Sequence, residues 1–103
     1  MIRVTFYKHA DSFTGFEFSG HSDYAEQGFD IVCAAVSSAA YLTANLLSES
    51  FSERIDVTQS DGYMKLTAEK SDNSGRLIFG LYQHLLQLEE QYTKDIIVKI
   101  TEV

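Results

Sequence analysis

The sequence has a single cysteine, Cys33, and contains no proline and no tryptophan. One cysteine excludes an internal disulfide, so nothing in the chain indicates an oxidising compartment, and we expect a cytoplasmic location. No apolar run approaches the length of a membrane span. Residues 1–8 alternate apolar and polar side chains, unlike the unbroken apolar block of a secretory signal. We therefore expect no membrane partner.

Basic residues are also few. Eight Lys and Arg stand against 15 Asp and Glu, which gives a formal net charge of −7. The cations are scattered and form no stripe, so direct binding of nucleic acid through phosphate contacts is not expected. An acidic surface favours encounter with a basic partner at low salt. Plain solubility is the simpler explanation of the charge taken alone.

The length of 103 residues, 45% of them hydrophobic, suits one domain over 1–103 with a modest core. Alternating patterns predict strands at 2–8, 13–20, 53–60, 63–69 and 95–103, and apolar residues three or four apart predict helices at 31–49 and 75–92. Asp61-Gly62 predicts a two-residue turn, and Gly15 suggests a bulge. The order ββαββαβ predicts a two-layer α+β fold, a mostly antiparallel or mixed five-stranded sheet with two helices.

The chemistry centres on residues 20–40, "GHSDYAEQGFDIVCAAVSSAA". His21 follows a predicted strand, and Asp30 stands at the expected N-cap of the next helix. Cys33 then falls at N3, where free N–H groups and the helix dipole favour the thiolate and can stabilise an oxyanion. In such a site Cys33 attacks a carbonyl, and His21 serves as general acid and base.

Other interpretations of these residues stay open. A lone cysteine in an alanine-rich helix is usually a small packing residue. Structural zinc is not expected, because no paired ligand spacing is present, and no cofactor is indicated. Asp30 is primarily a cap and, as a minority interpretation, orients His21.

The intervening loop, 22–29, supplies weaker candidates, each with a packing alternative. Tyr24 and Phe29 are possible peptide contacts, and Gly20 and Gly28 are possible loop hinges. Ser37, one turn beyond Cys33 on the same helix face, is a possible substrate contact.

The segment "GHSDYAEQGFDIVCAAVS" resembles the signature of the ribosomal-processing cysteine proteases, the Prp family. Its elements are a Gly-His pair, a variable loop and an Asp-(Ile/Val)-Val-Cys-Ala helix start. The small acidic chain and the order ββαββαβ resemble that family over the whole length. One departure is Ser22, where the family often has alanine.

The resemblance implies a single cysteine-protease-like domain over 1–103. It implies an endopeptidase that removes a short N-terminal extension from a large-subunit ribosomal protein. It places the catalytic histidine and cysteine at His21 and Cys33, the motif aspartate at Asp30 and the motif serine at Ser37. It also implies a homodimer. The alternative hypothesis is a non-catalytic, ribosome-associated binding module.

Overall fold

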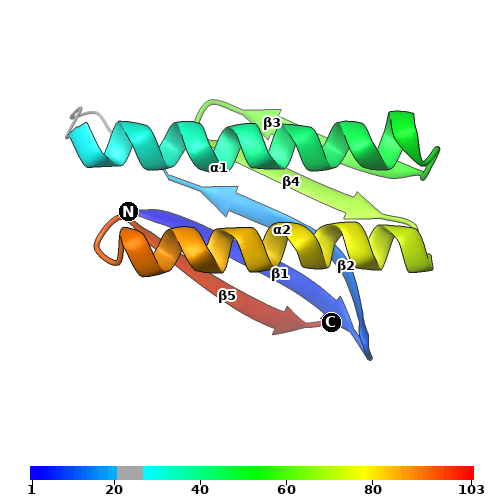
Figure 1. The fold of residues 1–103 in the computed structure, drawn as a ribbon. Coiled ribbons are helices and arrows are strands. Elements are labelled where there is room, and N and C mark those ends of the chain that lie inside the picture. The colour runs from blue at the N-terminus through cyan, green and yellow to red at the C-terminus, as the bar shows by residue number, and fades with distance from the viewer. Residues whose placement is uncertain (21–26) are drawn as a thin grey trace.

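The computed structural model describes the backbone of residues 1–20 and 27–103, and the side chains of residues 1–20 and 31–103. One sheet is built from β1 (Ile2–His9), β2 (Ser12–Ser19), β3 (Ile55–Ser60), β4 (Tyr63–Ala68) and β5 (Ile96–Glu102). The helices are α1 (Gln27–Asn45), continued by the π-helical turn η1 (Leu46–Ser50), and α2 (Asp72–Gln91). Both helices lie over one face of the sheet (Figure 1). The predicted order ββαββαβ and the two-layer α+β class are confirmed.

The strand order across the sheet is β3-β4-β2-β1-β5. The β1–β5 pair is parallel, and the other three pairs are antiparallel, so the sheet is mixed. The pairing of β1 with β2 shifts after Tyr7, which pairs with Gly15, while Lys8 pairs with Phe13. Thr14 is therefore the extra residue of a bulge beside Gly15, as the glycine suggested.

Both helices begin earlier than the apolar pattern predicted. The hydroxyl oxygen of Ser71 accepts the backbone N–H of Ser74, and the hydroxyl oxygen of Ser74 accepts the backbone N–H of Ser71. This capping box satisfies two N–H groups of the first turn and starts α2 at Asp72, not at 75. The polar residues just before the predicted helix 75–92 are thus the cap and first turn of α2.

The segment Ile31–Ser50 corrects the expectation that no apolar run approaches a membrane span. It is 20 residues long with a mean hydropathy of 1.5, enough by length and composition alone. In this fold one stripe of it packs on the sheet, because Val32, Val36 and Ala40 are almost fully buried. The exposed Ile31 and Leu42 on the other faces add to the hydropathy.

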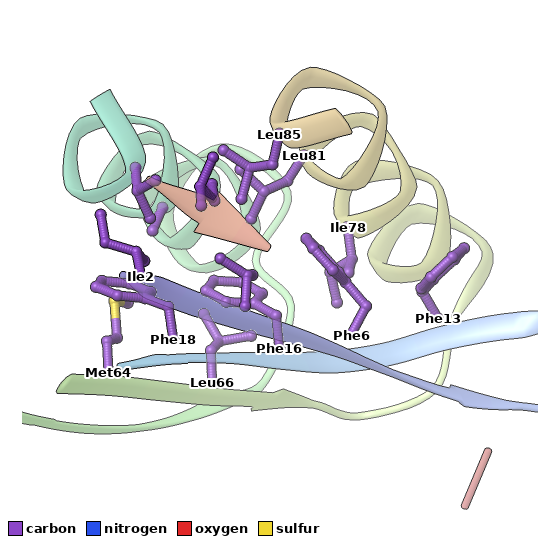
Figure 2. Packing of buried hydrophobic residues seen from close by; sticks show 14 of the residues in the cluster. Ile2, Phe6, Phe13, Phe16, Phe18, Met64, Leu66, Ile78, Leu81 and Leu85 are labelled. Carbon is purple, nitrogen blue, oxygen red and sulfur yellow. The ribbon is translucent and has the colours of Figure 1, made fainter. Parts of the chain in front are cut away.

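The core lies between the sheet and the helix pair. Paired positions on neighbouring strands place apolar side chains on the same sheet face, for example Val4 with Phe18 and Phe16 with Leu66. Figure 2 shows Phe16 and Leu66 on the sheet face that the helices cover, with Ile78, Leu81 and Leu85 of α2 in the same core. Burial of this apolar area is the main term that holds the helices on the sheet.

The other sheet face carries a polar cluster. The Tyr7 hydroxyl donates to Glu17 Oε1 at 2.8 Å, and the Tyr63 hydroxyl donates to Glu17 Oε2 at 2.5 Å. The Lys65 ammonium lies 5.4 Å from the centroid of the Tyr7 ring. These hydrogen bonds, from Tyr63 first and then Tyr7, lower the pKa of Glu17, because they favour the ionised carboxylate.

Candidate active site

Gly20 fixes the point from which the chain enters the candidate site. Its N–H donates to the carbonyl oxygen of Gly62 at 3.0 Å, which ties the end of β2 to the β3–β4 turn. A Cβ added at Gly20 would lie 2.8 Å from Ile2 Cα. Glycine is therefore required here by the close approach of β1. The hinge role of Gly20 stays a prediction.

His21 and Tyr24 lie outside the described residues, so their expected roles as base and peptide contact stay predictions. The chain order does constrain the site. His21 directly follows Gly20, whose neighbours are Ile2 and Gly62. The chain then reaches α1 after residue 26.

Cys33 lies on α1, where it is half-buried and packs against the edge of the core. Counted from Gln27 it is the seventh residue of the helix. The prediction that Cys33 occupies N3 is therefore wrong. The unsatisfied N–H groups and the dipole effect belong to the first turn of a helix, and Cys33 lies beyond that turn. The N–H groups at the helix start thus lie about one turn before Cys33, and the activated thiol stays a prediction.

The same helix boundary revises three other assignments. Asp30 is the fourth helical residue, so its predicted position at the N-cap is wrong. Gly28 and Phe29 also belong to the first turn of α1, so the predicted loop 22–29 is wrong at residues 27–29. Whether Asp30 orients His21, and whether Phe29 contacts a peptide, stay predictions.

The faces of α1 show where Cys33 points relative to the rest of the fold. Ala35 and Ala39 line a groove shared with α2. Cys33, Ser37 and Tyr41 follow one another at four-residue intervals on a different flank. The amide of Gln59 on β3 donates a hydrogen bond to the Tyr41 hydroxyl, so this flank faces β3.

Ser37 is half-buried one turn beyond Cys33, as the spacing predicted, and its contact with substrate stays a prediction. Tyr41 and Gln59 were missed by the sequence reasoning. The four-residue spacing from Cys33 through Ser37 to Tyr41 was the available signal for Tyr41. Nothing in the sequence indicated Gln59, because the side-by-side placement of β3 and α1 depends on strand order.

The other two histidines lie elsewhere. His9 at the end of β1 is exposed, with its Nδ1 2.8 Å from the carbonyl oxygen of Val103. His84 is exposed on α2. Among the side chains of residues 1–20 and 31–103, no group of three or more His, Cys, Asp or Glu is placed to hold a metal ion.

Comparison with known proteins adds an independent result. Residues 1–97 match the family model "Cysteine protease Prp". The ribosomal processing cysteine protease Prp of Bacillus subtilis is 28% identical over 105 residues, which cover 93% of this chain and 94% of that protein.

Solved structures of Staphylococcus aureus Prp share the fold. The structure of its complex with a substrate peptide has a TM-score of 0.90 and 25% identity, covering 98% of this chain and 100% of that one. The complex with a covalently linked product peptide has a TM-score of 0.85 and 27% identity, with the same coverage.

Proposed function

Because the chain belongs to the cysteine protease Prp family, we propose that it is a cysteine endopeptidase that removes a short N-terminal extension from a large-subunit ribosomal protein. The observation that carries the proposal is the motif from Gly20 to Ser37 set on this fold. The half-buried Cys33 lies on α1, and the residue before His21 is fixed at the end of β2. The Staphylococcus aureus structure with a covalently linked product peptide supports covalent chemistry in the family.

In the proposed reaction His21 takes the proton of the Cys33 thiol, and the thiolate attacks the scissile carbonyl carbon. The tetrahedral intermediate collapses as the C–N bond breaks, and the His21 imidazolium protonates the leaving amine. His21 then takes a proton from water, and the hydroxide attacks the thioester carbonyl. The C–S bond breaks, the His21 imidazolium returns its proton to the departing Cys33 thiolate, and the carboxylic acid product ionises in water.

Because Cys33 lies in the second turn of α1, we propose that His21 has the main role in forming the thiolate. An adjacent imidazolium lowers the pKa of a cysteine, whereas the helix terminus is one turn away. Since Asp30 is the fourth residue of α1 and not its N-cap, an orienting role is the one we propose for it. We infer that its carboxylate holds the imidazole, as the third member of a triad does.

The test is a cleavage assay by mass spectrometry with a peptide that spans the extension junction. The wild-type protein should cut at one bond, and Cys33→Ala and His21→Ala should reduce turnover by at least a hundredfold while circular dichroism stays unchanged. Cleavage that survives Cys33→Ala would exclude the proposed nucleophile. Peptide binding without any cleavage by the wild type would favour the non-catalytic binding module instead.

We further infer a cytoplasmic homodimer with no direct nucleic-acid contact. The single cysteine and the net charge of −7 support the location and the lack of phosphate contacts. Exposed apolar side chains on α1 support association, since Leu42 is 60% exposed beside a groove of about 550 Å³ between the helices. Sedimentation equilibrium at micromolar concentration tests the dimer, and a monomer mass throughout would contradict it.

A further inference from the structure

The outer edge of β3 lies beside the helix flank that carries Cys33. Among the strands that the structure describes, β3 is bonded to β4 alone, at one end of the order β3-β4-β2-β1-β5. Five of its six residues, Asp56 to Ser60, are exposed. Such an edge presents N–H and C=O groups on which an extended peptide can form another strand.

The register of the β3–β4 hairpin identifies which groups face outward. Ser60 and Tyr63 flank the two-residue turn, and the N–H of Glu69 donates to the carbonyl oxygen of Arg54 at 2.9 Å. Hydrogen-bonded and non-bonded pairs alternate in an antiparallel ladder. The N–H and C=O groups of Val57 and Gln59 therefore point away from β4, toward the open edge.

This edge is linked to the candidate nucleophile through α1. The Gln59 amide bonds the Tyr41 hydroxyl, and Tyr41 lies eight residues beyond Cys33 on the same flank. Eight residues of helix span about 12 Å. An extended peptide covers that distance in about four residues, so one chain can occupy the β3 edge and present a bond to Cys33.

The charge at the start of β3 selects the kind of peptide. A cavity of about 700 Å³ there is lined by Glu53, Asp56 and Glu69, with Arg54 as the one cation among its lining residues. Arg54 Nε is 4.0 Å from Glu69 Oε2, in an exposed pair that is easily screened. Asp56 and Glu53, whose Oε1 accepts the Ser71 hydroxyl, are paired with no cation among these lining residues, and their charge favours a peptide with Lys or Arg at this end.

We propose that the substrate binds as an added strand on the outer edge of β3, hydrogen-bonded to Val57 and Gln59, with basic residues toward Glu53 and Asp56. This rests on the proposed function and names how that substrate is held. The other edge strand, β5, is less suited, because it lies at the opposite end of the strand order from β3, the strand that contacts the Cys33 flank of α1. The Val57 side chain, 44% exposed, supplies an apolar contact along the same path.

The experiment compares proline variants at the two edges of the sheet. Val57→Pro removes an outward N–H without breaking a bond to β4. The matched control is Ile100→Pro on β5, which is also 44% exposed. The N–H of Val103 donates to the carbonyl oxygen of Lys8 on β1. Every second residue of β5 points its N–H toward β1, so the N–H of Ile100, three residues before Val103, points outward. We expect Val57→Pro to raise KM about 3- to 10-fold with kcat nearly unchanged, and Ile100→Pro to leave both unchanged.

Gln59→Pro replaces Val57→Pro if the latter does not fold by circular dichroism. A third measurement uses the wild-type protein, with substrate peptides N-methylated at one backbone amide at a time. Sensitivity at alternate amides supports the added strand. A folded Val57→Pro with wild-type KM, or equal sensitivity at every amide, overturns it.

Binding of a fluorescently labelled junction peptide to the Cys33→Ala variant separates this proposal from the proposed function. Weakened binding in the Cys33→Ala/Val57→Pro double variant supports docking even if the wild type cuts nothing. Cleavage that ignores both β3 prolines removes the docking proposal and leaves the endopeptidase intact. Replacement of Glu53 by Gln and of Asp56 by Asn should weaken the binding of a basic peptide several-fold at low salt. The binding of a neutral peptide should stay unchanged. An equal loss for both peptides counts against the charge assignment.

Discussion

The backbone N–H of Gly20 donates to the carbonyl oxygen of Gly62, and this bond joins the end of β2 to the turn of the neighbouring hairpin. The turn itself depends on Gly62, whose φ of 69° is accessible to glycine without a Cβ clash. Two residues 42 positions apart in the chain thus fix the backbone of Gly20, the residue before His21, the proposed base. A catalytic base needs such an anchor, because an error of about 1 Å in its position has a large cost in rate.

Replacement of Gly20 by alanine should therefore destabilise the fold and disturb the site. The new Cβ would meet Ile2 Cα at 2.8 Å, so β1 or the end of β2 must move. We expect a loss of about 1–3 kcal/mol in the free energy of unfolding, measured by urea denaturation. Peptide turnover should fall by more than the loss of folded protein explains.

The matched control for this change is Gly80→Ala. Gly80 lies in α2, and its added Cβ would have no neighbour within 4 Å. Alanine in a helix interior should raise stability by about 0.5–1 kcal/mol. Equal effects of the two substitutions would show that the close approach at Gly20 is not a constraint.

The reactivity of Cys33 should depend on His21 more than on the helix. We expect the wild-type thiol to react with iodoacetamide at neutral pH at least tenfold faster than a model thiol. In His21→Ala the pH midpoint of labelling should move up toward the ordinary thiol value of about 8.5. An unchanged midpoint in that variant would remove the imidazole as the activating group.

The orienting role inferred for Asp30 has its own readout. Asp30→Asn should lower kcat for the junction peptide about tenfold or more, and it should shift the pH profile of kcat/KM, because the imidazole loses its anionic partner. Asp30→Glu should restore part of both. If Asp30→Asn lowers only the melting temperature, the residue serves the helix and not the base.

Glu17 should make stability depend on pH in the acid range. Its folded-state pKa is lowered by hydrogen bonds from Tyr63 and Tyr7, so it contributes stability that is present above its unfolded pKa, about 4.3. That contribution is lost as the pH falls through the folded value. We expect Glu17→Gln to flatten the decline of the unfolding free energy between about pH 5 and 3. An equally steep decline in the variant would assign the acid sensitivity to other carboxylates.

Much of the fold follows from local patterns, and what was missed depends on contacts between distant segments. The alternation in 63–69 and the Asp61-Gly62 turn determined the β3–β4 hairpin, because both signals are local. The starts of α1 and α2 were placed too late. The polar residues of a first helical turn, such as Asp72, carry no apolar periodicity. The motif identified Cys33, but the contact of Tyr41 with Gln59 needed the strand order.

The start of α2 gives a last prediction, on stability alone. Ser71 accepts the N–H of Ser74 at 3.0 Å and donates to Glu53 Oε1 at 2.8 Å, so one hydroxyl holds the cap and the segment before β3. Ser71→Ala should lower the free energy of unfolding by about 0.5–2 kcal/mol, because Ser74 is almost fully buried and its N–H loses a partner. Chemical denaturation measures this loss. Ser50→Ala, at an exposed serine, is the control and should stay within about 0.5 kcal/mol.

Glu53→Gln tests the bond from the Ser71 hydroxyl to Glu53 separately. It should lower the free energy of unfolding by less than Ser71→Ala does, since the cap on Ser74 survives. If Glu53→Gln costs as much as Ser71→Ala, then the link to Glu53, and not the cap, stabilises this end of the helix.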